Sequence, residues 1–398
     1  MIEAVDTKAK GLRTPRVSEA AAVGDFLRRL DWLLMLAVAA LVAYGLWAID
    51  GITASDPGGS QMGRQATFAV GGSVLFLAAL VVDPDLFRRR KRAIYAGTLG
   101  LMAFVLVAGA AARGSRRWID LGFFRLQPSE FGKVLFTLFL AAFLADRARR
   151  TSEVRTVLAT IGLALPPILL VFAQPDLGTA LVYFAVLGAV LFVAGVRWLH
   201  LGVLFLIAAL ATTAVLWALP AAGVNVLKPY QRDRFTTFMN PSKDPSGSTY
   251  NVNQSITAVG AGGVNGRGVK NASQTSLSYL PEPATDFVFA SLAEQRGFAG
   301  AAVLLLLYLL VVWRGLRVMA GARDAYAAIV AGGLVCMFVF QIFINVGMTI
   351  GIAPITGIPL PFVSAGGSAM VTNLLAIGIL QSIRVRSVVP RRPRRSRR

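Results

Sequence analysis

Long apolar stretches separated by short charged segments run through most of this chain. A helix that crosses a bilayer needs about 20 mostly apolar residues, and the stretches meet that length. We predict ten spans, at residues 32–50, 65–83, 93–112, 131–146, 155–173, 177–195, 198–219, 288–313, 325–347 and 362–383. The pattern therefore predicts an all-α polytopic membrane protein, with a kink at Pro166-Pro167 in the fifth span.

An even number of spans places both ends of the chain on one side of the membrane. Basic residues concentrate in the segments on that side, at Arg88–Arg92, Arg147–Arg155, Arg197, Arg314–Arg323 and the C-terminus. Because lysine and arginine are enriched in cytoplasmic loops, we assign this side to the cytoplasm. The predicted organisation is a cytoplasmic tail (1–30), one membrane domain (31–384) with a large extracytoplasmic loop (221–290) between helices 7 and 8, and a basic cytoplasmic tail (385–398).

Composition excludes several classes of function. Of 398 residues, 56 % are hydrophobic and 15 % are charged, and the net charge is +20. The basic residues lie in short connecting segments and in the tails, which argues against nucleic acid and makes anionic membrane lipids the expected partner of the C-terminal tail. The one cysteine, Cys336, and the one histidine, His200, leave no thiolate metal site or imidazole base for the outer face. Acid–base chemistry there would need a carboxylate.

Some cations lie on the outer side, against the orientation bias. They gather in residues 113–133 and in the large loop. Such cations suit an anionic substrate, above all a phosphate, although each alone is also able to reach outer lipid headgroups. The candidates for substrate binding in the loop are Lys228, Arg232, Arg234, Arg267 and Lys270, and the segment 113–133 adds further basic residues.

Asp286 is the most informative acid of the chain. It stands in ATDFVFA, where the polar loop becomes the eighth span. A partly dry position at the membrane surface raises the pKa of a carboxylate and makes it a better base. The alternative is an acid that stabilises the start of a helix. Glu282 is a second carboxylate in the same stretch and is a candidate for substrate binding.

The segment QPDLGT leaves two interpretations open. Pro175 suits the first turn of the sixth helix, and Asp176 suits its N-terminus. Alternatively, Asp176 holds a cation or a sugar hydroxyl.

Two glycine-containing segments also leave alternatives open. Residues 348–368 are too rich in proline and glycine for a continuous helix. Ser364 and Gly366 either form a turn whose free N–H groups meet an anion or pack a plain re-entrant turn. The stretch ITAVGAGGVNGRGVK either wraps Arg267 and Lys270 around a diphosphate or is a flexible, solvated loop.

Six blocks together resemble one known family. They are SRRWIDLGFFRLQPSEFGK, QPDLGT, KPYQRDRFTTFMNPSKDPSG, YNVNQS, GGVNGRGVKNASQTSLSYLPEPATDFVFASLAEQRGF and IAPITGIPLPFVSAGGS. In this order, between about residues 113 and 383, they resemble the SEDS family of RodA and FtsW. The KPYQRDR and SEFGK forms look more like the elongation protein than the division protein.

This resemblance implies an inner-membrane peptidoglycan glycosyltransferase that polymerises lipid II on the outer face during elongation and cell-shape maintenance. The alternatives are a septal polymerase or a lipid-linked precursor flippase. A flippase needs polar groups across both leaflets, whereas the inner halves of the predicted spans contain almost no ionisable residues. The implied ligands and partners are a divalent cation (Mg²⁺ or Mn²⁺), polyprenyl diphosphate and a class B penicillin-binding protein.

The resemblance also implies roles for particular residues. Asp286 matches the catalytic aspartate and is the candidate metal ligand. Arg117 and Trp118 match the family's RW pair, and Lys133 matches the lysine after QPSE. Three positions depart from the pattern: Ala365 replaces a tyrosine, Gln295 replaces the second acid of an AEE stretch, and Ala284 replaces a histidine.

Overall fold

The computed structural model describes residues 19–54, 61–112, 115–122, 124–224, 238 and 248–387. The predicted ligands Lys228, Arg232 and Arg234 lie outside the described residues, as do both ends of the chain.

Ten helices cross the molecule, as predicted. Within the described residues, nine helices are long and apolar enough to span a membrane, and a shorter apolar helix of 17 residues completes the set. They are α2 (Trp32–Thr53), α3 (Gln61–Val81), α5 (Lys91–Ala108), α6 (Pro128–Ala145), α7 (Val154–Ala173), the shorter α8 (Leu177–Val193), α9 (Trp198–Thr213) with its extension through the π-turn η1 (Ala214–Ala218) into α10 (Leu219–Ala221), α14 (Val288–Ala320), α15 (Ala325–Thr349) and α16 (Gly367–Ser387). The α7 helix runs unbroken through both of its prolines.

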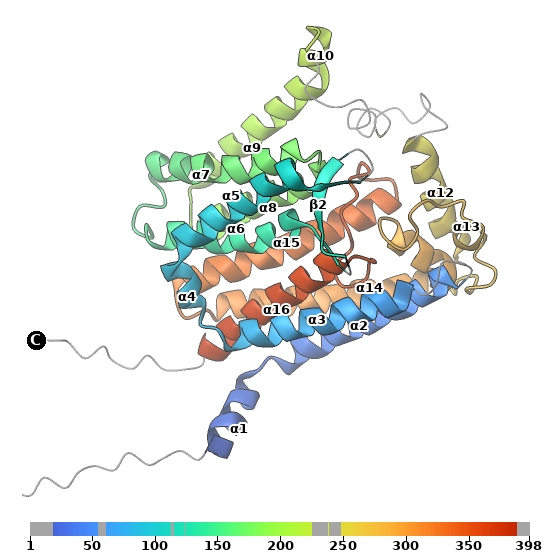
Figure 1. Ribbon diagram of the computed structural model, residues 1–398, viewed down its shortest axis with the longest axis horizontal. Coiled ribbons are helices and arrows are strands. Elements are labelled where there is room, and N and C mark those ends of the chain that lie inside the picture. Colours follow the sequence, from blue (N-terminus) through green and yellow to red (C-terminus); the bar gives the residue numbers. More distant parts are fainter. Residues whose placement is uncertain are drawn as a thin grey trace, which may run out of the picture.

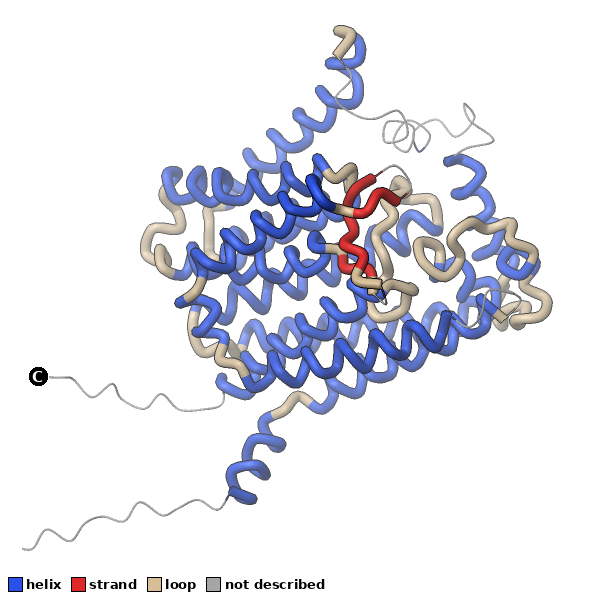
Figure 2. Tube along the Cα trace, in the orientation of Figure 1, coloured by secondary structure: helices blue, strands red, loops and turns tan. Residues whose placement is uncertain are grey.

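The two ends of the helix bundle differ in character. The basic end carries α1 (Glu19–Arg29), α4 (Pro84–Arg89) and the end of α16, so the described part of the chain begins and ends on the same side (Figure 1). The loop end carries α12 (Ser248–Ala261), α13 (Ser273–Ser276) and an antiparallel sheet of β1 (Ala110–Ala112), β2 (Ser115–Asp120) and β3 (Arg125–Leu126). Figure 2 shows these strands in red, beside the loops of that end.

The centre of the bundle is built by α6, α15 and α16. In the most apolar 18-residue stretch of each helix, the fraction of buried residues is 78 % in α6, 67 % in α15 and 83 % in α16. In the helix Trp198–Ala221 it is only 6 %. That last helix, α9 with η1 and α10, leans away from the other helices (Figure 1). Its side chains therefore face the lipid rather than the protein, which fits a helix that is apolar on all sides.

Two predicted spans have wrong boundaries. The span at 93–112 ends as a helix at Ala108, because Gly109 is extended (φ −70°, ψ 148°) and the alanines that follow pair with β2. The span at 362–383 begins only at Gly367. Pro359, Pro361 and the left-handed Phe362 (φ 66°) keep the preceding residues out of a helix. Both errors arose because apolar composition alone does not separate helix from strand or turn.

The predicted large loop contains ordered structure that the sequence did not indicate. Its glycine-rich part crosses α14, which is broken at Gly297 (φ 66°, ψ −166°). At this break Phe298 N donates to Gly263 O at 2.8 Å, and Arg267 N donates to Glu294 O at 2.9 Å. A Cβ atom at Gly262 would overlap the Ala293 carbonyl oxygen. The glycines thus permit close backbone packing, and the interpretation as a flexible loop was wrong.

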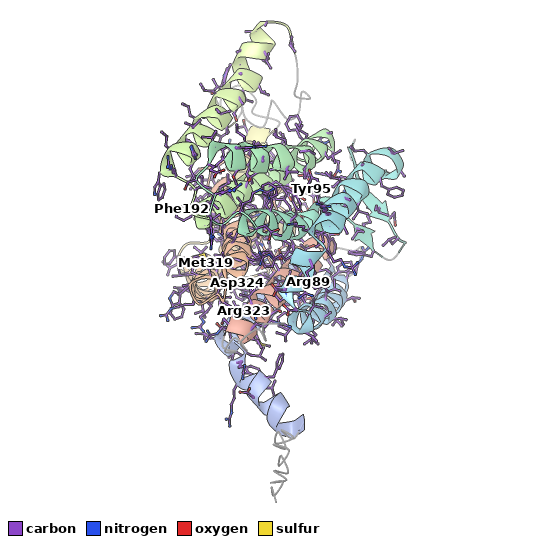
Figure 3. The ribbon with its side chains drawn as sticks, turned by 90° about the vertical axis from the view of Figure 1, so that its left-hand side faces the viewer. Arg89, Tyr95, Phe192, Met319, Arg323 and Asp324 are labelled. Carbon is purple, nitrogen blue, oxygen red and sulfur yellow. The ribbon has the colours of Figure 1, made fainter. Side chains whose placement is uncertain are left out.

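Ion pairs join the helices at the basic end, which faces the viewer in Figure 3. Asp146, which follows α6, pairs with Arg88 at 2.8 Å and with Lys91. Partial burial raises the pKa of Asp146, but these hydrogen bonds outweigh it and leave the pKa below its ordinary value. Nearby, Arg314 of α14 binds both oxygens of Asp31, the N-cap of α2. The pairs fix the ends of helices that are far apart in sequence.

Candidate functional site

Asp286 lies at the loop end, in the turn that directly precedes α14. Its side chain is half-buried, between the fully buried helix start and the exposed loops. The first residue of α14 is Val288 and its N-cap is Phe287. Asp286 therefore stands just outside the helix, where it is accessible in part and still close to the positive end of the helix dipole.

The backbone around Asp286 is held at five consecutive carbonyl groups. The Glu282 carbonyl accepts from the amides of Thr285 and Phe287, both at 3.2 Å. The next four carbonyls accept as follows: Pro283 from Ser291 Oγ at 3.1 Å, Ala284 from Ala365 N at 2.8 Å, Thr285 from Ser364 Oγ at 2.6 Å, and Asp286 from Asn345 Nδ2 at 3.0 Å. Because each carbonyl has a donor, the turn has one backbone arrangement and Asp286 one position.

Asn345 joins this turn to the proline-rich segment. Its side-chain amide is fully buried in α15 and also donates to Ile358 O at 2.8 Å. The Oδ1 atom of Asn345 has no hydrogen-bond partner among the described residues. A buried amide with one unsatisfied atom is costly, and the two carbonyls that bind its nitrogen offset part of that cost.

The segment before α16 packs the site rather than presenting free amides. Ser364 N donates to Leu360 O at 3.0 Å, Ala365 N to Ala284 O, and Gly366 N to Gln65 Oε1 at 3.0 Å. The prediction that Ser364 and Gly366 offer amides to a substrate anion was therefore wrong, since these amides already have protein acceptors. The alternative interpretation, a re-entrant turn that packs the bundle, is what the structure contains.

Arg117 forms a second cluster with Asp176. Arg117 extends from β2 and lies 3.7 Å from an Asp176 carboxylate oxygen. Asp176 caps α8 by accepting from Thr179 N at 3.1 Å, as predicted, and also accepts from Gln127 Nε2 at 2.9 Å. Pro175 precedes the cap instead of occupying the first helical turn, so that detail of the prediction was wrong. The Arg117 side chain keeps about 30 % exposure, which leaves part of the guanidinium facing the surface.

Ser368 connects the two clusters. Its hydroxyl donates to Arg125 O at 3.0 Å and accepts from Gln127 N at 2.9 Å. The segment 364–368 thus contacts the Asp286 turn at one end and the Gln127–Asp176 cluster at the other. Through this segment the structure brings Asp286, Arg117 and Ser364 into one region of the loop end.

Lys133 is fully engaged inside the bundle. Its Nζ lies 2.8 Å from both carboxylate oxygens of Glu130, and the lysine side chain is 1 % exposed. In this buried pair, the positive charge of Lys133 and the negative charge of Glu130 compensate each other. The structure therefore contradicts the prediction that Lys133 contacts the substrate directly.

The other predicted ligands occupy separate places. Trp118 is half-buried in β2, next to Arg117. Lys270 is exposed in the segment between α12 and α13, and Arg267 donates from Nε to Ala261 O at 3.0 Å.

Glu282 lines a cleft of about 290 Å³ beside this turn. The cleft is formed by Ile52, Thr53, Gln61, Thr275, Ser276, Ser278, Glu282, Pro283, Ala284 and Thr285. Glu282 adopts a left-handed backbone (φ 49°), and its Oε2 accepts from Thr285 Oγ1 at 2.9 Å.

The described residues do not gather into a protein cage for a divalent cation. No group of three or more histidine, cysteine, aspartate or glutamate side chains gathers in the described part of the chain. A cage made of protein ligands alone is therefore not formed there. Mg²⁺ is usually held by one or two carboxylates together with substrate phosphates, and the half-buried Asp286 fits that weaker requirement.

Sequence reasoning missed the residues that hold the site in place. Asn345, Gln65 and Glu294 are buried polar side chains in spans or at their ends. Glu294 accepts from Gln274 N at 2.9 Å, from Thr275 N at 3.0 Å and from Thr275 Oγ1 at 2.7 Å. Polar residues within apolar stretches are the signal that was available, because such residues are rarely left without a function in a membrane.

Comparison with known proteins agrees with this architecture. A family model described as a cell cycle protein, for FtsW, RodA and SpoVE, matches residues 27–388. Stage V sporulation protein E of Bacillus subtilis is 36 % identical over 362 residues, which are 90 % of this chain and 96 % of that protein. Peptidoglycan glycosyltransferase MrdB of Escherichia coli K12 is 36 % identical over 354 residues, 89 % of this chain and 93 % of that protein.

Solved structures share the fold. A structure titled as a peptidoglycan synthase complex that coordinates polymerisation and crosslinking aligns with a TM-score of 0.77 and 31 % identity, covering 90 % of this chain and 98 % of that chain. The crystal structure of the rod shape determining protein RodA of Thermus thermophilus aligns with a TM-score of 0.68 and 28 % identity, covering 91 % and 98 %.

The fold and the relatives define a membrane-embedded glycosyltransferase. Within that class, the chain belongs to the FtsW/RodA/SpoVE family, which confirms the resemblance to SEDS proteins. Relatives named RodA and FtsW both match, at 32 % and 36 % identity, so family membership alone does not separate elongation from division.

Proposed function

We propose that this protein polymerises lipid II into glycan strands at the outer face of the inner membrane. Three kinds of observation support the proposal: relatives named peptidoglycan glycosyltransferases, an orientation in which the basic end faces the cytoplasm, and a half-buried carboxylate at the opposite end. The single observation that carries it is Asp286, fixed by five hydrogen-bonded carbonyls at the loop end.

Asp286 acts as the general base in this proposal. The 4-hydroxyl of one sugar attacks the anomeric carbon of another, whose leaving group is polyprenyl diphosphate. A hydroxyl is a poor nucleophile near neutral pH, and a positioned base accelerates such a step by about 10²- to 10⁴-fold. A single base fits one displacement with inversion, from an α-linked donor to a β-linked polymer.

Cations at the loop end stabilise the diphosphate as it departs and gains charge. Arg117 is the best placed, because it is partly exposed and is oriented by Asp176. Trp118 lies beside it on the same strand. We propose the same role, stabilisation of the diphosphate, for three cations of the large loop: Lys270, Arg232 and Arg234.

A divalent cation, Mg²⁺ or Mn²⁺, would be held by Asp286 together with oxygens of the substrate. When bound, it would supply positive charge against the diphosphate. The protein's own contribution is to keep the carboxylate fixed and partly shielded from water.

We assign the protein to cell elongation and cell-shape maintenance, with a class B penicillin-binding protein as its partner. The KPYQRDR and SEFGK sequences support the elongation role, and the structural relative from a complex of polymerisation and crosslinking supports the partner. The crosslinking enzyme would receive the strands as they leave the loop end.

The test is polymerisation of labelled lipid II by the purified protein with its partner. We expect Asp286→Asn to abolish glycan ladders, because it removes the base while keeping the size of the side chain. Asp50→Asn is the matched control, since Asp50 is an exposed aspartate at the outer end of α2. Chelation of divalent cations should also stop the reaction. Normal ladders from Asp286→Asn would remove Asp286 from its role.

A further inference from the structure

The cleft beside Asp286 has a lining unlike that of a phosphate site. It lies between the end of α2, the start of α3, α13 and the turn at 282–285. Among the described residues that line it there is no lysine or arginine, and Glu282 is the one ionisable side chain of that set. A diphosphate would therefore meet a carboxylate and no cation. A single carboxylate is also too few protein ligands for a metal cage.

The polar groups of the cleft divide into two sets. Thr53, Thr275 and Thr285 belong to the first set. The Thr53 hydroxyl donates to Ile49 O at 2.9 Å, and those of Thr275 and Thr285 donate to Glu294 at 2.7 Å and to Glu282 at 2.9 Å. The side chains of Gln61, Ser276 and Ser278, in contrast, make no hydrogen bond to any residue that the structure describes. An amide and two hydroxyls are thus available as both donors and acceptors for an uncharged ligand.

The remaining surface of the cleft is apolar. Ile52, Pro283 and Ala284 contribute carbon atoms, so the lining combines apolar and polar surface. A sugar ring has the same division, because its edge carries hydroxyl and amide groups while its faces expose C–H groups. The volume of about 290 Å³ lies just below the range of about 300–1,000 Å³ for ligand pockets, which suits a single sugar ring.

We infer that this cleft binds an uncharged amino-sugar ring of the glycan, apart from the diphosphate. Gln61 and Ser276 supply hydrogen bonds, and Glu282 accepts from a sugar hydroxyl. Glu282 and Thr285 lie within four residues of Asp286 in the fixed turn, so a bound ring is held close to the base. The assignment of the ring to a glycan strand rests on the proposed function, but the binding itself is independent of catalysis.

The test is titration of the full-length protein in detergent with a soluble tetrasaccharide of β-1,4-linked N-acetylglucosamine, by calorimetry or saturation-transfer NMR. We expect saturable binding that Gln61→Leu and Ser276→Ala each weaken by about 3- to 10-fold, the loss of one hydrogen bond. Neither substitution removes a side-chain hydrogen bond from the described protein, so both variants should keep the native melting temperature.

Thr67→Val is the matched control, because the Thr67 hydroxyl is exposed on α3 and bonds only to Gly63 O of its own helix. It should bind the tetrasaccharide like the wild type. The inference is overturned if the wild type does not bind, if Gln61→Leu and Ser276→Ala bind normally, or if inorganic pyrophosphate displaces the tetrasaccharide.

Failure of the cleft and failure of the proposed function give different results. If Asp286→Asn abolishes polymerisation but no tetrasaccharide binds, the function stands and the cleft does not. If the tetrasaccharide binds through Gln61 and Ser276 while Asp286→Asn still polymerises, the cleft stands and the catalytic assignment does not.

Discussion

Single side chains at the loop end divide into Asp286, the proposed base, and the residues that hold it in place. Asp286 was identifiable from the sequence because it is an isolated acid at the edge of an apolar span. Asn345 and Ser364 were not identifiable as its supports, since they lie 59 and 78 positions away, and a single sequence does not reveal such a contact. Lys133 shows the opposite error. Its position suggested a substrate ligand, yet its ammonium group is paired with the carboxylate of Glu130, three residues earlier.

Asn345→Leu tests the support of Asp286. The change leaves the carbonyls of Asp286 and Ile358 without their buried donor, at a cost of about 1–3 kcal/mol of stability. We expect kcat to fall by about 10- to 100-fold, because a small misplacement of a catalytic group has that effect, while KM stays within about twofold. Kinetics well below the melting temperature would measure this.

The control for Asn345 is Thr98→Val, which removes a buried hydroxyl that bonds to Ile94 O within its own helix. It should leave kcat unchanged. A raised KM with normal kcat in Asn345→Leu would mean that Asn345 serves binding rather than the position of Asp286.

Lys133→Met tests the buried pair. Removal of one partner leaves an unpaired buried carboxylate and should cost about 3–5 kcal/mol of unfolding free energy. The double variant Glu130→Gln/Lys133→Met should regain most of that loss, as measured by thermal unfolding in detergent. Native stability in the single variant, with weaker lipid II binding, would restore Lys133 as a substrate ligand.

Among the elements, the spanning helices were predictable and their connections were not. Hydrophobic length determines a crossing almost alone, so all ten helices were found, although α3, α5, α14 and α16 differ from their predicted ends by four to seven residues. The hairpin at 110–126, the helices α12 and α13, and the broken α14 depend on backbone pairing between distant segments. Glycine has no side chain and so adds nothing to a hydrophobic pattern. The sequence GGVNGRG therefore did not indicate that this segment crosses α14 at Gly297.

Alanine substitutions at two neighbouring glycines test whether the glycine-rich segment packs against α14. They are expected to change the stability of the protein in opposite directions. At Gly262 a Cβ atom would overlap the Ala293 carbonyl oxygen, whereas at Gly260, in α12, it would meet nothing within 4 Å. We expect Gly262→Ala to destabilise the protein by about 1–3 kcal/mol. Gly260→Ala should stabilise it by up to about 1 kcal/mol, since alanine favours helix.

Thermal unfolding and limited proteolysis of the segment 262–268 would measure both glycine variants. Equal effects of the two substitutions would mean that the loop does not pack closely against α14.

Across the whole molecule, the two ends of the bundle carry different chemistry. Ion pairs lock helices together at the basic end, whereas polar side chains and irregular backbone gather at the loop end. The sequence predicted this division from the distribution of arginine alone. It did not predict how far α9 leans from the bundle, because an apolar helix has the same composition whether it faces protein or lipid.

Cysteine accessibility tests the orientation. In a Cys336→Ser background, Lys270→Cys at the loop end should react with a membrane-impermeant maleimide in intact cells. Arg149→Cys at the basic end should react only after the membrane is permeabilised. Both positions are exposed in the structure, so the reversed pattern would place Asp286 in the cytoplasm and exclude the proposed reaction.

The five hydrogen-bonded carbonyls from Glu282 to Asp286 have a consequence for the proposed reaction. They hold the backbone of the turn, so the aspartate meets a proton mainly by rotation of its own short side chain. With Asp286 as the proposed base, each advance of the polymer by one unit would be made by the sugars, which slide past a fixed carboxylate. The length of that step would then be set by the repeat of the glycan and not by any stroke of the enzyme.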